Sequence, residues 1–136
     1  MKADLTVWGA RLQALVMGAG QATIGGLYGL APEELIRRPL APGQVSAVVW
    51  IESFGPIWVA LFVVSGLWLL GAVWRAHGFV RAHIAAAGVW AFYAGCILYS
   101  AVLTEPPVPI IAGTTAGFVA VLNIAIARAD AERGAR

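Results

Sequence analysis

The sequence IWVALFVVSGLWLLGAV, residues 57–73, decides the fold class of this chain. It contains no charged residue, and its one hydroxyl belongs to Ser65. A helix in a small water-soluble domain is apolar on one face only, whereas this stretch is apolar all round. A bilayer core about 30 Å thick needs about 20 such residues in a helix. The stretch, extended to residues 46–74, therefore predicts a helix that crosses a membrane.

The composition of the whole chain points to the same class. Of its 136 residues, 60% are hydrophobic and 12% are charged, whereas about 25% are charged in soluble domains. So few charges cannot cover the surface of a soluble domain. Three further apolar stretches lie at residues 12–30, 84–103 and 108–127. We therefore expect a single transmembrane domain over residues 1–136, an all-α integral membrane four-helix bundle with antiparallel spans.

The stretch 12–30 is the weakest of the four predicted spans. It contains Gln13, Gln21, Thr23 and five glycines, which make insertion into a bilayer less favourable. Two alternatives are a secretory signal peptide and a helix that lies on the membrane surface. Asp4 and the weakly hydrophobic centre argue against the signal peptide. We therefore expect a span.

The distribution of Lys and Arg predicts the orientation, because cytoplasmic loops are enriched in these residues. With four spans the two termini share one side of the membrane, and that side holds seven of the nine basic residues. The seven are Lys2, Arg11, Arg75, Arg81, Arg128, Arg133 and Arg136, and the two on the other side are Arg37 and Arg38. We therefore expect both termini in the cytoplasm. The frequent use of Arg, Ala, Gly and Val suggests a GC-rich genome such as that of an actinobacterium.

Small residues recur at a four-residue spacing, which lets helix backbones approach closely in lipid. The first stretch carries the longest series: Ala14, Gly18, Ala22 and Gly26. Shorter series follow the same spacing: Gly25 and Gly29, then Ala87, Ala91 and Gly95, then Gly113 and Gly117. We expect these residues to form helix-packing contacts. Contacts within one chain and contacts between copies in a homo-oligomer both remain open.

Two polar residues are candidates for an intramembrane polar site, Glu52 and Asn123. A carboxylate inside a membrane is usually functional, because lipid penalises it. As one helix, residues 46–74 would extend about 44 Å, which exceeds the hydrocarbon core of about 30 Å. We expect the end that carries Glu52, followed by Gly55 and Pro56, to lie at the outer interface. The alternative is a cavity between the helices.

The basic loop before residue 84 contains Arg75, His77, Arg81 and His83. We expect Arg75 and Arg81, together with the histidines, to contact anionic lipid headgroups. The two histidines are six residues apart, which does not place two metal ligands on one helix face. Cys96 is the only cysteine, so the chain cannot form an internal disulfide or a multi-thiolate metal site. We expect no metal and no cofactor.

Enzymes and nucleic-acid-binding proteins are the classes that the sequence argues against. It has no Gly-x-Ser-x-Gly, P-loop or His-Glu-x-x-His motif and no cluster of carboxylates. The basic residues are dispersed between apolar stretches and do not form a stripe or patch. We therefore expect a non-enzymatic protein whose main partner is the lipid bilayer.

The layout as a whole comprises a short basic start, a glycine-rich first span, three firmer spans and a small charged C-terminal tail. It resembles small four-span membrane proteins of actinobacterial phages, which are often found in or near lysis cassettes and include holins. The resemblance implies a protein that oligomerises in the host inner membrane, permeabilises it at a set time and has no catalytic residues. Two other functions fit the residues: an interaction protein such as a superinfection-exclusion factor, and a small channel or transporter subunit that uses Glu52 and Asn123.

Overall fold

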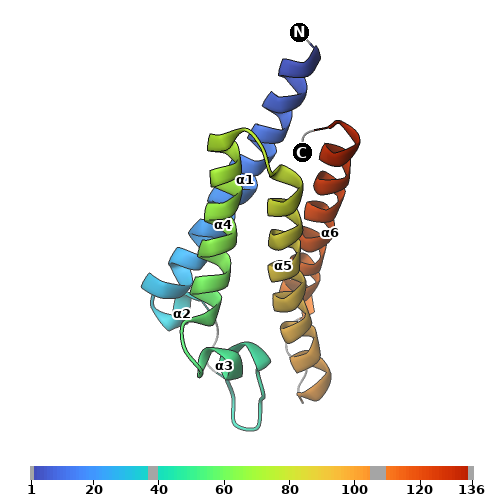
Figure 1. The fold of residues 1–136 in the computed structure, drawn as a ribbon. Coiled ribbons are helices and arrows are strands. Elements are labelled where there is room, and N and C mark those ends of the chain that lie inside the picture. Colours follow the sequence, from blue (N-terminus) through green and yellow to red (C-terminus); the bar gives the residue numbers. More distant parts are fainter. Residues whose placement is uncertain (1, 37–39, 105–109, 135–136) are drawn as a thin grey trace.

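The computed structural model describes residues 2–36, 40–104 and 110–134, and these ranges are helical with no strand (Figure 1). The helices are α1 (Lys2–Leu30), α2 (Glu33–Ile36), α3 (Ala47–Glu52), α4 (Ile57–Arg75), α5 (Phe79–Leu103) and α6 (Ile110–Glu132). The prediction of an all-α fold is confirmed. By length and composition, α4, α5 and α6 can each cross a membrane. The chain is therefore a multi-pass membrane protein.

The four long helices run antiparallel in chain order, so the N- and C-terminal ends lie at one end of the molecule (Figure 1). Helix α1 packs along α4, and α5 packs along α6. These two pairs meet mainly through α4 and α5, with a smaller contact between α1 and α5. Among the described residues, α6 has no substantial contact with α1 or α4. The long helices therefore form an open row in the order α1, α4, α5, α6, and the predicted four-helix bundle is not confirmed.

The predicted second span, residues 46–74, is two helices and not one. Helix α3 ends at Glu52 and α4 begins at Ile57. Between them Gly55 has a φ of +138°, a conformation that favours glycine, and Pro56 has no N–H group to continue a helix. The indole nitrogen of Trp58 donates to the carbonyl oxygen of Val48 at 2.9 Å. This bond holds α3 against the start of α4.

Ser100, near the end of α5, and Thr104, just after it, hold the start of α3 and the residues before it in place. The hydroxyl of Ser100 accepts from the backbone N–H of Ala47 at 2.8 Å. The hydroxyl of Thr104 donates to the carbonyl oxygen of Val45 at 3.0 Å and accepts from the N–H of the same residue at 3.3 Å. These bonds give hydrogen-bond partners to backbone groups of Val45 and Ala47 that have no partner within a helix.

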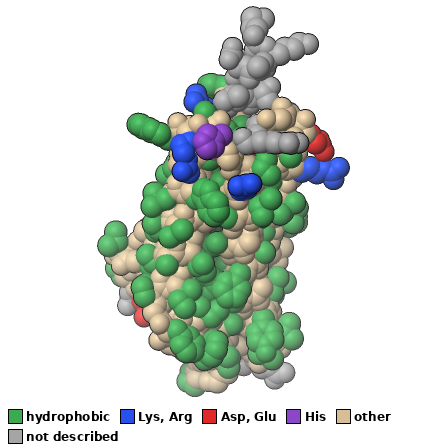
Figure 2. Space-filling model, viewed as in Figure 1, with side chains coloured by type: hydrophobic (Ala, Val, Ile, Leu, Met, Phe, Trp, Pro, Cys, Tyr) green, Lys and Arg blue, Asp and Glu red, His purple; other side chains and the backbone are tan. Residues whose placement is uncertain are grey.

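The interior contains two apolar clusters. The cluster nearer the chain termini is built largely of small side chains: Ala10, Ala14, Leu69, Ala72, Phe79, Ala82 and Ala86. The other is aromatic-rich and consists of Val48, Trp58, Phe62, Cys96 and Ile97, with Tyr28, Trp90 and Tyr93 packed against it. Figure 2 shows hydrophobic side chains over the middle of the visible face, and Lys, Arg and His side chains near the end that holds the termini. An apolar outer surface of this kind is what a bilayer requires.

Candidate functional sites

The contact between α1 and α4 is a seam of small residues. A Cβ atom added at Gly66 would lie 2.7 Å from the backbone nitrogen of Ala22 and 2.9 Å from the carbonyl oxygen of Gly18. A Cβ added at Gly25 would lie 2.9 Å from the backbone nitrogen of Val63. Only glycine permits backbones to approach this closely. The seam therefore joins Gly18, Ala22 and Gly25 to α4, and Gly66 is its central residue on that helix.

Gly26, which the sequence groups with Gly18 and Ala22, lies off this seam, with no atom within 4 Å of an added Cβ. The reason is helical geometry. Seven residues rotate a helix to within about 20° of two full turns, whereas eight residues add about 80°. The seam therefore continues from Gly18 to Gly25. Ala14 is fully buried in the apolar cluster near the termini.

The predicted small residues of α6 face α5. A Cβ added at Gly113 would lie 2.9 Å from the side chain of Leu98 and 3.0 Å from that of Ile97. At Gly117 the nearest atom is the Cβ of Ala94, at 4.0 Å. These contacts define the register of the α5–α6 pair.

A buried polar cluster that the sequence did not predict connects three helices. The side-chain amide nitrogen of Gln21 in α1 donates to the hydroxyl of Ser65 in α4. The indole nitrogen of Trp90 in α5 donates to the side-chain oxygen of Gln21 at 3.1 Å. Gln21 is 2% exposed, and both ends of its amide are bonded inside the protein. The one indication of this cluster in the sequence was the presence of Gln21 in an otherwise apolar stretch. The residues that bond to Gln21 could not be predicted from the sequence.

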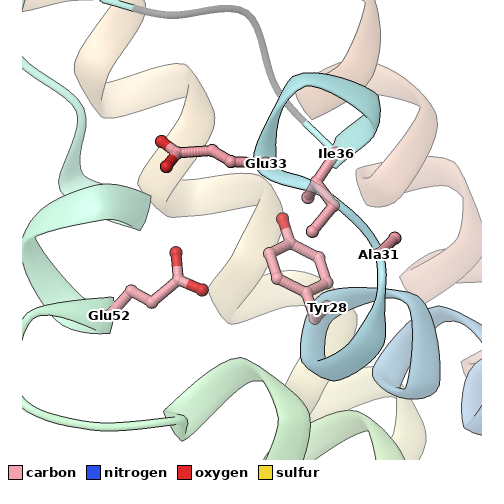
Figure 3. Close-up of a pocket in the computed structure, with 5 residues that line it drawn as sticks. All are labelled: Tyr28, Ala31, Glu33, Ile36 and Glu52. Carbon is pink, nitrogen blue, oxygen red and sulfur yellow. The ribbon is translucent and has the colours of Figure 1, made fainter.

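Glu52 lies in a hollow of about 150 Å³ at the end of the molecule opposite the termini. The hollow is lined by Tyr28, Ala31, Glu33, Ile36 and Glu52. Figure 3 shows the carboxylates of Glu33 and Glu52 and the hydroxyl of Tyr28 directed toward a shared space beside α2 and α3. Glu52 therefore lies among the short helices, outside the long helix α4.

Asn123 is fully buried between α6 and α5 and contacts a histidine. The Nδ1 atom of His83 lies 2.8 Å from the side-chain oxygen of Asn123. The expectation that His83 contacts lipid headgroups is therefore wrong. Helix α5 begins at Phe79 rather than at residue 84, so His83 lies in its second turn and faces α6. Arg75, His77 and Arg81 are exposed, as contact with headgroups would require.

Within the described ranges, no group of three or more His, Cys, Asp and Glu side chains could hold a metal ion. Cys96 is buried and is not in a disulfide. No known protein family, curated protein or solved structure matches this chain. The function must therefore be argued from the geometry of the molecule itself.

Proposed function

We propose that this chain is a bacterial inner-membrane protein with four spans and cytoplasmic termini, which permeabilises the membrane by associating with copies of itself, as holins do. The fourth span would be α1. Its contact with α4 along the glycine seam supports a position beside the other spans and not on the membrane surface. The internal bonds of Gln21 support the same position, because they remove the cost of placing an unpaired amide in lipid.

The observation that carries the proposal is an unused face of small residues on α5. Gly88, Ala91 and Gly95 are exposed, and an added Cβ would meet no atom within 4 Å at either glycine. At 100° per residue, these three positions lie within about 60° of one another around the helix. The glycines of the other seams, such as Gly66 and Gly113, contact neighbouring helices of the same chain.

A small-residue face drives association in a bilayer, because it allows close van der Waals packing where no hydrophobic effect pushes helices together. The flanking residues Ile84 and Val102 are apolar and exposed on the same side of α5. A second copy of the chain provides an identical face, as a symmetric dimer contact requires. Glu52, on which a channel or transporter subunit would depend, lies beside α2 and α3, which favours self-association over that alternative.

The test is inducible expression in bacteria, with entry of a membrane-impermeant DNA dye as the readout. We expect the wild type to admit the dye after a delay. Gly88→Leu and Gly95→Leu should delay or abolish dye entry at equal protein levels. Ala112→Leu, at an exposed position of α6, is the matched control and should behave as the wild type. Accumulation of the wild type without dye entry would refute permeabilisation and favour the interaction protein.

Disulfide crosslinking tests the contact between copies separately. In a Cys96→Ala background, Gly95→Cys should yield a crosslinked dimer in membranes, because the two α5 faces meet. Ala112→Cys should yield little crosslinked dimer, because this position lies on the opposite side of the α5–α6 pair from Gly95. Equal yields from the two positions would contradict a specific contact through α5.

A further inference from the structure

The register between α5 and α6 places His83 midway between two polar residues of α6. Gly113 lies against Ile97 and Leu98, and Gly117 is nearest Ala94. Because the helices are antiparallel, each step toward the start of α5 is matched by one step toward the end of α6. His83 is therefore level with Ala127, between Asn123 and Asp130. Ala127 is buried, and its methyl side chain leaves space for the imidazole ring.

The hydrogen bonds of Asn123 determine which nitrogen of His83 carries a proton. The side-chain nitrogen of Asn123 donates to the carbonyl oxygen of Val119 at 3.0 Å. The side-chain oxygen of Asn123 therefore faces His83, and the only bond it can form there is as an acceptor from Nδ1–H. In a neutral ring the other nitrogen, Nε2, then has no hydrogen and is an acceptor. It is buried and has no partner among the described groups.

Asp130 presents a second buried acceptor. Its Oδ1 atom accepts from the guanidinium of Arg133 at 3.0 Å, but its Oδ2 atom is buried without a partner among the described groups. His83 and Asp130 are both 0% exposed, and Asp130 lies three residues beyond Ala127, which is level with His83, so the two are separated by about one helical turn along the α5–α6 contact. Two acceptors cannot bond each other. Leaving a buried polar atom without a partner is costly, so a hydrogen-bond donor between them would be strongly favoured.

We propose that His83 and Asp130 form a binding site for one hydrogen-bond donor that joins α5 to α6 near the chain termini. Two sources can supply this donor. A proton taken up from water onto Nε2 would give an imidazolium, whose positive charge the nearby carboxylate of Asp130 would stabilise. A single water molecule could instead donate one hydrogen to Nε2 and the other to Oδ2.

Few charged side chains of the described residues lie near His83 and Asp130. On α6, Arg133 contacts Asp130, while Arg128 and Glu132 pair with each other on the surface at 2.9 Å. On α5, Arg81 is exposed. The side chains that α1 and α4 contribute to the neighbouring core cluster are apolar: Ala10, Ala14, Leu69 and Ala72, with Met17 and Val73 packed against them. Among the described residues, Asp130 is therefore the carboxylate that acts on His83.

The test is ¹⁵N NMR of the full chain labelled at histidine, in which His77→Gln assigns the signals because the chain has two histidines. We expect the Nε2 resonance of His83 to be that of a protonated nitrogen if the donor is a proton. It should be that of a hydrogen-bonded lone pair if the donor is water. A free lone pair at Nε2 in the wild type would overturn the proposal.

Two variants test the role of Asp130. Asp130→Asn retains the shape of the side chain but removes its charge, and we expect it to shift the Nε2 resonance. Glu132→Gln removes an exposed carboxylate from the same turn of α6 and should leave that resonance unchanged. If neither variant shifts it, the site does not involve Asp130 and the proposal is wrong.

Discussion

The clearest prediction of the packing concerns Gly66→Ala, the smallest change that can be made in the seam between α1 and α4. The added methyl group would meet the backbone nitrogen of Ala22 at 2.7 Å, the carbonyl oxygen of Gly18 at 2.9 Å and the Cα of Ala22 at 3.1 Å. All three atoms belong to the backbone of α1. No change of side-chain rotamer can relieve the contact, so the two helices must move apart.

The expected magnitude follows from two opposing effects. Overpacking a well-packed site costs about 1–3 kcal/mol, and contacts with backbone atoms place this site at the upper end of that range. Alanine in a helix interior is favoured over glycine by about 1 kcal/mol, which offsets part of the cost. We therefore expect Gly66→Ala to lower the free energy of unfolding by about 2 kcal/mol.

The assay is unfolding of detergent-solubilised protein by increasing proportions of sodium dodecyl sulfate, followed by circular dichroism. Gly26→Ala is the matched control, because Gly26 is helical, belongs to the same helix pair and has no atom within 4 Å of an added Cβ. It should leave the free energy of unfolding unchanged or raise it slightly. The reasoning is refuted if Gly66→Ala is as stable as the wild type, or if both variants lose the same stability.

Three further predictions concern the polar cluster, the topology and the acidic hollow. Gln21→Leu leaves the indole N–H of Trp90 without its acceptor and should lower the free energy of unfolding by about 1 kcal/mol in the same assay. Reporter fusions after Arg136 and in the loop at residues 76–78 should both report the cytoplasm, and a periplasmic signal from either would contradict the orientation. Glu52→Gln should change the free energy of unfolding by less than about 1 kcal/mol and leave dye entry intact. A loss of dye entry would show that Glu52 has a role in permeation.

The sequence was sufficient to predict the four long helices, although not where α1 and α5 begin, because hydropathy and helix-breaking residues act locally. The apolar stretch at residues 57–73 became α4, and Gly55 and Pro56 separated it from the segment that carries Glu52. The contacts between elements were harder to predict. Gly18 was identified by its spacing, but its partner Gly66 depends on how α1 and α4 are rotated toward each other. His83 was placed in a loop because Arg81 and His83 are polar, although the fold buries the histidine against Asn123.

Helix α1 packs along a helix that can cross a membrane, although its own hydropathy is low. Its glycines and glutamines lower its hydropathy, and it is not among the helices that can cross a membrane by length and composition. The same residues are the ones that fit it to its neighbours. Gly18 and Gly25 bring its backbone against α4, and Gln21 bonds Ser65 and Trp90. In the four-span arrangement proposed above, the free energy that favours α1 in a bilayer therefore comes largely from its contacts with α4 and α5 and not from lipid. In that arrangement, separating α1 from α4, as Gly66→Ala does in part, should weaken the insertion of α1.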